Sequence, residues 1–331
     1  MRIVVDAMGS DKYPAPDVEG AVAAAREWND EIILVGDKTR IDAELGKYQT
    51  SGLKLEVVHA GEVIEMTDKP ADSAKSKPNS SMHVGTKLVA DGQAQAFVSA
   101  GNTGGILAVS TLYTLKRIRG VSRPALSAVF PNMTANRTVV SDIGANTDCK
   151  PDLLLQFGIM AGLYAELALQ ITKPRVALLS NGEEEEKGNA LVKETADMMR
   201  GSQALNYVGN VEPKEVLRGE ADVVIADGFT GNILLKTLEA TASMVTGLIR
   251  EEIGAGLVTK LGGALALPAF RRVRRRTDPF EVGGAPLLGV DGVVIVAHGR
   301  SNAFAIKNAV NRAREAVSSN LVEAIRAGIN A

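Results

Sequence analysis

Cysteine, histidine and long apolar runs are rare or absent in the sequence, and each absence excludes a class of protein or site. A single cysteine stands among 331 residues, which excludes an intrachain disulfide framework and any CxxC metal knuckle. Only three separated histidines accompany it, so the ligands of a dedicated transition-metal site are missing and we expect no metal. No stretch reaches roughly 18 uncharged apolar residues, and we therefore expect no membrane-spanning helix.

Neither sign of charge is in excess, because 37 Lys and Arg face 39 Asp and Glu. With 45% apolar and 23% charged residues, the composition is that of a globular protein and excludes disorder. The motifs GxGxxG, GxxxxGK[ST], GxSxG and HExxH are absent, which disfavours dinucleotide-binding, P-loop, serine-hydrolase and zincin classes. The opening MRIVVDAMGSD has a three-residue apolar run and does not resemble a signal peptide, so we expect a cytoplasmic protein.

One pattern recurs along the chain, and it uses many of the 33 glycines. A short β-branched run ends in glycine and small polar residues, and a helix-like segment follows. The pattern occupies residues 3–11, 32–38, 97–105, 139–148, 176–188, 223–232 and 293–302, with helical patterns over 17–28, 80–90, 151–170, 232–252 and 301–325. Alternating strands and helices predict an α/β fold with a mostly parallel sheet in three α/β/α layers. No linker separates two halves, so we expect one two-lobed unit over residues 1–331.

The glycine-rich loops after the predicted strands suit an anionic ligand. In open parallel sheets, ligands bind outside the carboxyl ends of the strands, where we expect these loops to converge. Glycines let the backbone approach a ligand closely, and helix N-termini there offer free amides that favour phosphate. The alternative is that these are ordinary turns, since such loops occur throughout α/β proteins.

Three of these loops contain side chains that are candidates for catalysis. In residues 181–188 (NGEEEEKG), Lys187 and one carboxylate face the cleft, or the acids only serve the first turn of a helix. Asp227 follows a buried strand, where a carboxylate is either functional or a helix cap. His298 holds the same topological place and is either catalytic or a structural hydrogen bonder.

Stretches over the whole length, in one order, resemble the PlsX family of bacterial acyl-ACP:phosphate acyltransferases. They are VDAMGSD at 5–11, LVGDKTRI at 34–41, HAGEVIEMTDKP at 59–70, NSSM at 79–82, SAGNTGG at 99–105, RPALSAVFP at 123–131, DIGANTDCKPDLLLQFGIMA at 142–161, LLSNGEEEEKGN at 178–189, ADGFTGNILLKTLE at 226–239, GGAPLLGVDG at 283–292 and AHGRSNAFAIKNAV at 297–310. The family start is close to DAMGGDHAP, and Ser10 and Lys12 here replace its glycine and histidine. A histidine role in that loop is therefore not available.

The resemblance implies transfer of a long-chain fatty acyl group from acyl carrier protein to orthophosphate, which gives acyl phosphate for phospholipid synthesis. It also implies a homodimer without cofactors and a fold similar to phosphotransacetylase and isopropylmalate dehydrogenase. Further implied partners are the inner face of the cell membrane, which the protein contacts peripherally, and the membrane glycerol-3-phosphate acyltransferase that uses acyl phosphate.

This reaction needs no catalytic triad. Phosphate already carries nucleophilic oxygens, and the leaving thiol has a pKa near ~8.5, so direct attack in a ternary complex suffices. As hypotheses, Lys187 supplies positive charge with Glu184 orienting it, and His298 protonates the leaving thiolate. Donors for phosphate or the oxyanion are Asn102, Thr103, Gly104 and Asn146, while Asp227, Thr230 and Asn232 orient donors or the pantetheine arm.

Residues 253–276 break the recurring pattern and form an apolar segment followed by a basic one. Leucines four apart give one helical apolar face, and five arginines follow within six positions. The residues are Leu257, Leu261, Leu265, Arg271, Arg272, Arg274, Arg275 and Arg276. This segment favours an anionic membrane surface, with the acidic carrier protein or a dimer-interface helix as alternatives. Nucleic acid is disfavoured, because aromatics are not interleaved and the chain is not basic overall.

Two other classes of function stay open at this point. One is a related enzyme of similar fold, either a CoA-dependent phosphate acyltransferase or a nicotinamide dehydrogenase. The other is a non-catalytic scaffold that binds membrane or carrier protein.

Overall fold

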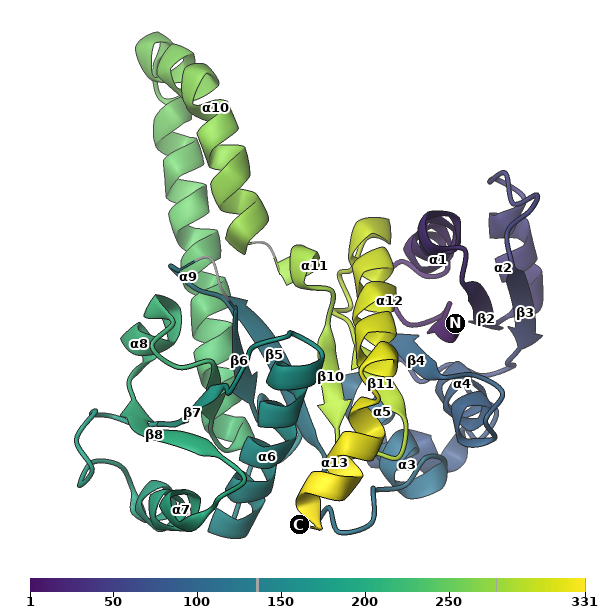
Figure 1. Ribbon diagram of the computed structural model, residues 1–331. Coiled ribbons are helices and arrows are strands. Elements are labelled where there is room, and N and C mark those ends of the chain that lie inside the picture. Colours follow the sequence, from purple (N-terminus) through teal and green to yellow (C-terminus); the bar gives the residue numbers. More distant parts are fainter. Residues whose placement is uncertain (135–136, 278, 331) are drawn as a thin grey trace.

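In the part of the chain that the structure describes, eleven strands form one sheet whose two halves belong to two lobes (Figure 1). The computed structural model describes residues 1–134, 137–277 and 279–330, with side chains except those of 274–277 and 279. The strands are β1 (Arg2–Asp6), β2 (Glu31–Gly36), β3 (Leu55–His59), β4 (Ala96–Ser99), β5 (Ala125–Pro131), β6 (Arg137–Ser141), β7 (Arg175–Leu179), β8 (Asn206–Val211), β9 (Val223–Ile225), β10 (Ala285–Leu288) and β11 (Val293–Val296). Their order is β3-β2-β1-β4-β11-β10-β5-β6-β9-β7-β8.

Helices cover both faces of this sheet, and one helical hairpin leaves it. The helices are α1 (Ala15–Trp28), α2 (Lys38–Leu45), α3 (Pro70–Ser76), α4 (Ser81–Ala90), α5 (Thr103–Ala108), η1 (Val109–Tyr113, a π-helix), α6 (Pro151–Leu167), α7 (Ala190–Gly201), α8 (Pro213–Arg218), α9 (Gly228–Gly254), α10 (Leu257–Thr277), α11 (Pro279–Val282), α12 (Ala303–Ser318) and α13 (Leu321–Ile329). In Figure 1, α9 and α10 run side by side away from the body of the molecule.

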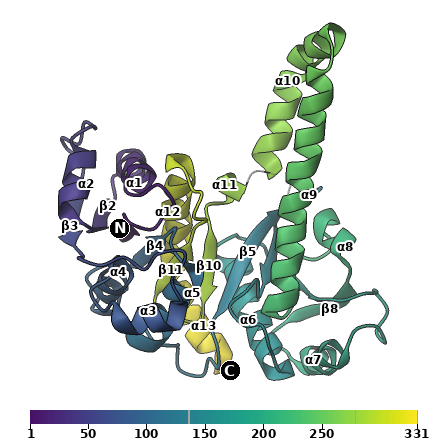
Figure 2. The same ribbon diagram turned by 180° about the vertical axis from the view of Figure 1, so that it is seen from behind.

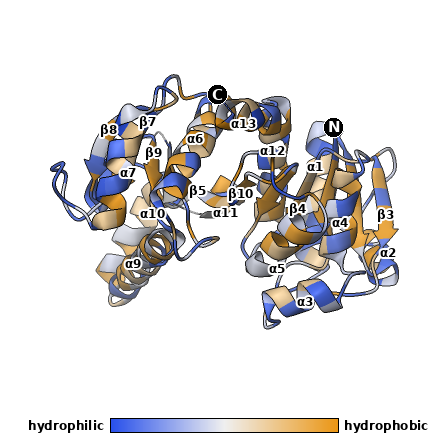
Figure 3. Ribbon diagram, turned by 90° about the horizontal axis from the view of Figure 1, so that it is seen from below, coloured by the Kyte–Doolittle hydropathy of each residue, from blue (hydrophilic) through white to orange (hydrophobic). Residues whose placement is uncertain are grey.

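Alternate residues of the buried strands supply two separate cores. In β1, Ile3 and Val5 pack on one face with α1, α6, α12 and α13, the helices in front in Figure 1. Val4 packs on the other face with α4, α5 and α9, seen in Figure 2. Most strands are accordingly hydrophobic throughout, whereas the covering helices are mixed in character (Figure 3). The predicted three-layer, mostly parallel α/β architecture is confirmed.

The sheet reverses its direction at its centre, which the sequence pattern did not predict. Strand β10 is antiparallel to both β11 and β5, and β5 is antiparallel to β6. The four strands β6, β9, β7 and β8 therefore run opposite to β3, β2, β1, β4 and β11. The expectation that all strand-end loops converge at one edge is wrong, because the carboxyl ends of the two blocks lie at opposite edges.

Some element boundaries also differ from the pattern. The helix expected over 301–325 is two helices, since Asn320 adopts φ 51° between α12 and α13. Strands β3, β5, β8 and β10 lie outside the recurring pattern, and β10 is only four residues long and contains Pro286. Among the described residues, no helix is long and apolar enough to cross a membrane.

Candidate active site

A cavity of about 350 Å³ lies where the two lobes meet, with residues of α9 from one lobe and of the loop after β11 from the other in its wall. Residues of α5, α9, α11 and α12 and of β5, β10 and β11 line it. Apolar side chains form much of its wall: Leu126, Ala128, Ile143, Leu235, Val282 and Val296. Polar side chains at the cavity are Thr103, Asn232, Lys236, Glu239, His298 and Ser301. An apolar pocket with a few convergent polar groups is the usual form of a small-molecule site.

The short strand β10 explains how loops from opposite edges reach one cavity. Ala285 at its start pairs with Val296, and Leu288 at its end pairs with Ala125. Four residues of strand span roughly 13 Å. The loop after β11, with His298, and the loop after β6, with Gly144, therefore both line the cavity from opposite directions.

His298 stands at the cavity as a neutral hydrogen-bond donor. Its Nδ1 accepts a hydrogen bond from the backbone amide of Arg300 at 3.1 Å, so in the neutral ring Nε2 carries the proton. Loss of hydration, together with the positive charges of Arg300 and Lys236, lowers the pKa of His298 below its usual value. The neutral ring can donate from Nε2 to a carbonyl or phosphate oxygen at neutral pH.

Thr103 and Asn232 are the other predicted residues that line the cavity. Thr103 begins α5 and is exposed, and Asn232 lies in the first turns of α9 opposite it. Asn232 is also near the loop after β6, since its Cβ is 3.9 Å from the position a Gly144 side chain would take. Both side chains are therefore placed to donate to a ligand between α5 and α9.

Asn102 and Gly104 hold the start of α5 in place. The buried Asn102 caps the helix, accepting from the Gly105 amide at 3.0 Å, and its Nδ2 lies 3.1–3.3 Å from three backbone carbonyls of residues 65–68. Gly104 allows Pro70 to approach, because an added Cβ would lie 2.6 Å from that ring. These contacts engage the side-chain amide of Asn102 within the protein.

A buried carboxylate, Asp142, organises the loop after β6. It accepts hydrogen bonds from the amides of Leu126, Gly144, Ala145 and Asn146 and from Nδ2 of Asn146, at 2.6–3.3 Å. Burial raises its pKa despite these donors. Asn146 also donates to the carbonyl of Pro124 at 2.8 Å, so its amide nitrogen is engaged within the protein.

Asp227 and Thr230 form the start of α9. Asp227 is the N-cap, accepting from the Thr230 amide at 2.9 Å and from its hydroxyl at 2.7 Å. This is the capping geometry that was the structural alternative for Asp227. It orients the first turns of α9, which carry Asn232 into the cavity.

The close approach of α9 to the loop after β6 requires glycine at position 231. A Cβ there would lie 1.9 Å from the carbonyl oxygen of Asp142. We expect Gly231→Ala to lower the free energy of unfolding by about 1–3 kcal/mol, since the backbone must move apart. Gly247 lies in the same helix with nothing within 4 Å, and Gly247→Ala is expected to stabilise the protein slightly. Urea unfolding of both variants checks this, and equal stability of the two would contradict the packing described.

Lys187 and Glu184 lie in a separate loop, between β7 and α7. Both are exposed, and neither lines the cavity. The Lys187 amide donates to the Glu184 carbonyl at 3.0 Å, and both side chains lie beside Gly182. Because α7 begins at Ala190, the four glutamates precede the helix and do not form its first turn. Strands β6 and β7 both pair with β9 in parallel, so the loops that follow these three strands lie at the same edge of the sheet. The loop with Lys187 therefore belongs to the same edge as Asn146 and Asp227.

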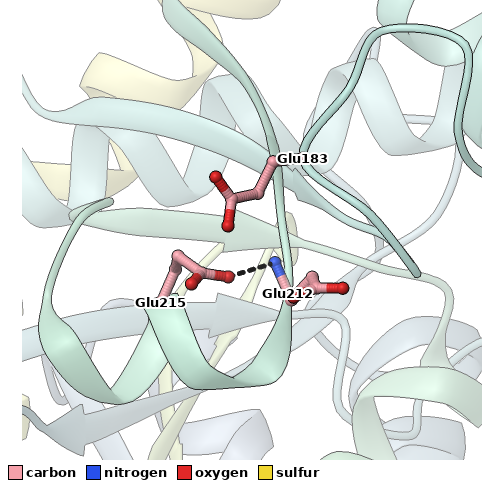
Figure 4. Close-up of side chains that lie close together, drawn as sticks. All are labelled: Glu183, Glu212 and Glu215. Carbon is pink, nitrogen blue, oxygen red and sulfur yellow. Dashed lines mark hydrogen bonds between the residues drawn. The ribbon is translucent and has the colours of Figure 1, made fainter.

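A cluster of carboxylates adjoins this loop. Glu183, Glu212 and Glu215 have oxygens within 4.8 Å of one another, as Figure 4 shows. The ammonium of Lys214 lies 3.2, 2.6 and 3.4 Å from them, and these carboxylates raise the pKa of Lys214. Glu215 also accepts from the Glu212 amide at 3.0 Å as part of a helix cap. Lys214, together with Arg218 at 3.7 Å from Glu215, offsets part of the negative charge of this cluster.

The α9–α10 hairpin carries the predicted apolar face outside the cavity. Leu257, Leu261 and Leu265 are 82, 70 and 86% exposed, so the described part of a single chain leaves these side chains largely open to solvent. Arg271 and Arg272 lie on the same helix and are exposed. The side chains of Arg274, Arg275 and Arg276 lie outside the described residues.

Three polar residues of the cavity were not singled out from the sequence. Lys236 and Glu239 follow Asn232 at four and seven positions along α9, and they form an ion pair at 2.9 Å. That spacing places Asn232, Lys236 and Glu239 on one helix face. Given Asn232 as a site residue, the sequence spacing alone would have indicated the other two. Ser301 lies three residues after His298, and no sequence signal distinguished its hydroxyl from other serines.

Solved structures share this fold. A phosphotransacetylase from Streptococcus pyogenes aligns with a TM-score of 0.63 at 18% identity, covering 96% of this chain and 94% of its own. A 4-hydroxythreonine-4-phosphate dehydrogenase from Klebsiella pneumoniae aligns at 0.52 and 14% identity, covering 95% and 99%. These alignments show that the chain shares the α/β fold of the phosphotransacetylases.

Sequence comparison gives the family. Residues 1–324 match the family described as fatty acid synthesis protein. The phosphate acyltransferases of Syntrophotalea carbinolica and Pelotomaculum thermopropionicum are each 47% identical, covering 96% and 99% of this chain and 91% and 95% of their own. The chain belongs to this family, the PlsX phosphate acyltransferases of fatty acid and phospholipid synthesis.

Proposed function

We propose that the cavity between α5 and α9 transfers a long-chain acyl group from the thioester of acyl carrier protein to orthophosphate. The observation that carries this proposal is one apolar cavity with His298, Lys236 and Thr103 around it. The apolar wall suits the first part of the acyl chain, and the polar groups suit a thioester carbonyl and a phosphate. The product is acyl phosphate, and the free carrier leaves as its thiol.

Phosphate attacks the thioester directly in this proposal. A phosphate oxygen forms a bond to the carbonyl carbon, and the carbon–sulfur bond breaks as the thiolate leaves. The single cysteine disfavours an acyl-enzyme route, because Cys149 does not line the cavity and burial raises the pKa of its thiol to about 11. Positioning of the two substrates and donors to the developing oxyanion supply the rate enhancement.

The residues then divide by their contacts. His298 donates from Nε2 to the carbonyl oxygen or to the leaving sulfur, and Thr103 and Asn232 donate from the two sides of the cavity. Asn102, Gly104, Asn146, Asp227 and Thr230 hold the loops that present these donors. Lys187, with Glu184, supplies positive charge from the loop after β7.

The assay for this function mixes the protein with phosphate and long-chain acyl carrier protein. Free carrier thiol and hydroxylamine-trappable acyl phosphate should appear together and only with phosphate present. Acyl coenzyme A in place of the carrier tests the related acyl donor. Absence of phosphate-dependent thiol release would contradict the proposal.

The protein is further proposed to work as a cytoplasmic homodimer at the inner face of the cell membrane. There it binds acyl carrier protein and passes acyl phosphate to the membrane glycerol-3-phosphate acyltransferase. The exposed leucines of α10 and the arginines that follow support a membrane contact for this hairpin.

Replacing the five arginines between 271 and 276 by serine should weaken binding to anionic vesicles by at least about tenfold. Each basic residue near such a surface contributes about 1 kcal/mol before screening. Co-sedimentation with phosphatidylglycerol vesicles measures this, with phosphatidylcholine vesicles as the neutral control. A matched variant with serine at Leu257, Leu261 and Leu265 should weaken binding to both. Unchanged binding of the arginine variant would leave carrier protein or the second subunit as the partner of the basic end.

A further inference from the structure

The N-terminus of α12 adjoins the cavity, since Ser301 and Ala305 belong to its lining. The Ser301 amide donates to the His298 carbonyl at 2.8 Å, and Asn302 caps the helix by accepting from the Ala305 amide at 2.9 Å. Among the described residues, no hydrogen bond engages the amides of Ala303 and Phe304. Since α12 is 16 residues long, its N-terminus also carries the positive end of a helix dipole.

A second and independent feature points to a ligand at the same place. Ser301 lines the cavity and is 6% exposed, yet its hydroxyl has no hydrogen-bond partner in the described part of the chain. A buried hydroxyl without a partner is unfavourable, and rotation about its Cα–Cβ bond directs it to a bound group. Such a hydroxyl beside free helix amides is a donor set for an oxyanion.

The opposite wall adds a cation. Lys236 of α9 lines the cavity and, with Arg300, lowers the pKa of His298 by its charge. Lys236 forms an ion pair with Glu239, whose carboxylate lies 2.9 Å from Nζ. Two of the three donor hydrogens of the ammonium remain for a ligand. The negative charges of Glu239 and Asp11 act in the opposite direction and raise the pKa of His298. The site thus combines a hydroxyl, free amides and one ammonium.

We propose that this end of α12 binds the phosphate oxyanion of the reaction, with Ser301 and Lys236 as its side-chain ligands. The assignment rests on the proposed acyl transfer to phosphate. Two phosphates are present in that reaction, orthophosphate and the phosphodiester of the carrier's pantetheine arm. His298 lines the cavity beside Ser301 and donates to the thioester in the proposed reaction, whereas a long arm separates the phosphodiester from the thioester. The occupant is therefore orthophosphate, the nucleophile.

The test is Ser301→Ala, with Ser318→Ala at the far end of the same helix as the matched control. Loss of a hydrogen bond to a charged ligand should raise the KM for phosphate about tenfold. The KM for acyl carrier protein should change less than about twofold. Lys236→Gln should act in the same direction, against Lys87→Gln, an exposed helix lysine that is also ion-paired. Equilibrium dialysis with radiolabelled inorganic phosphate should show the same weakening without acyl donor.

Each outcome decides one point. A rise in the KM for acyl carrier protein alone would overturn the assignment in favour of the pantetheine phosphodiester. An unchanged phosphate KM in an active Ser301→Ala enzyme would overturn the site and leave the proposed function intact. No phosphate-dependent transfer by the wild type would instead defeat the proposed function. The thermal midpoint of Ser301→Ala should equal or exceed that of the wild type, because the hydroxyl removed has no partner in the described structure.

Discussion

Replacing His298 by alanine is expected to lower the rate of acyl-phosphate formation by at least about 100-fold. One preorganised donor to a developing oxyanion contributes this much in other acyl transfers. The ring is held by the Arg300 amide at Nδ1, so its Nε2 hydrogen is directed away from that loop. His298→Gln keeps an amide donor near the position of Nε2 and should recover part of the rate. His59→Ala removes an exposed histidine at the end of β3 and serves as the control.

The pH profile separates two roles for His298. Its pKa lies below the ordinary value near 6.5, so the ring gains its proton only as the pH falls through that lower value. If the neutral ring donates a hydrogen bond, the advantage of wild type over His298→Gln is constant from pH 7 to 9 and declines in acid. If the imidazolium protonates the leaving thiolate, that advantage falls with each unit of rising pH. Taking the ratio of the two enzymes removes the titration of phosphate itself.

Lys187→Ala is expected to lower acyl-phosphate formation by at least about 100-fold if its ammonium stabilises the developing charge. Lys187 is exposed in the loop after β7 and does not line the cavity, so the variant tests whether this loop acts on the substrates at all. Lys187→Arg keeps the charge and should retain more activity than alanine. Steady-state rates of carrier thiol release measure both variants.

Lys193→Ala, which removes an exposed lysine of α7, is the control for this loop. Near-normal turnover of Lys187→Ala would remove that residue from the mechanism. The cavity and His298 would be unaffected by that result, since no contact in the described structure joins them to Lys187. The two variants therefore test separate parts of the proposed site.

The fold class was predictable because the strands are buried on both faces. Runs such as residues 3–5 and 293–296 are apolar throughout, and that signal is local in the sequence. The reversal of the sheet at β10 and β5 was not predictable, because strand direction depends on pairing partners far apart in the chain. Pro286 and a length of four residues also hide β10 as a strand.

The residues of the site were likewise only partly predictable from the sequence. His298, Thr103 and Asn232 were chosen as polar residues after strands or at helix starts, and all three line the cavity. Lys236 was missed because its place at the cavity depends on which face of α9 turns toward the sheet. Ser301 was missed because only its burial distinguishes it from the other serines. Several other chosen residues have their polar groups engaged by backbone partners, which a sequence does not reveal.

The most direct test of direct transfer in the cavity is a grid of initial rates over phosphate and acyl-carrier concentrations. Both substrates must occupy the cavity together before the carbon–sulfur bond breaks, so reciprocal plots should intersect. Thiol should not be released in a burst without phosphate. Parallel lines, or a burst of one thiol per site in the absence of phosphate, would show a covalent acyl-enzyme and contradict the proposed mechanism.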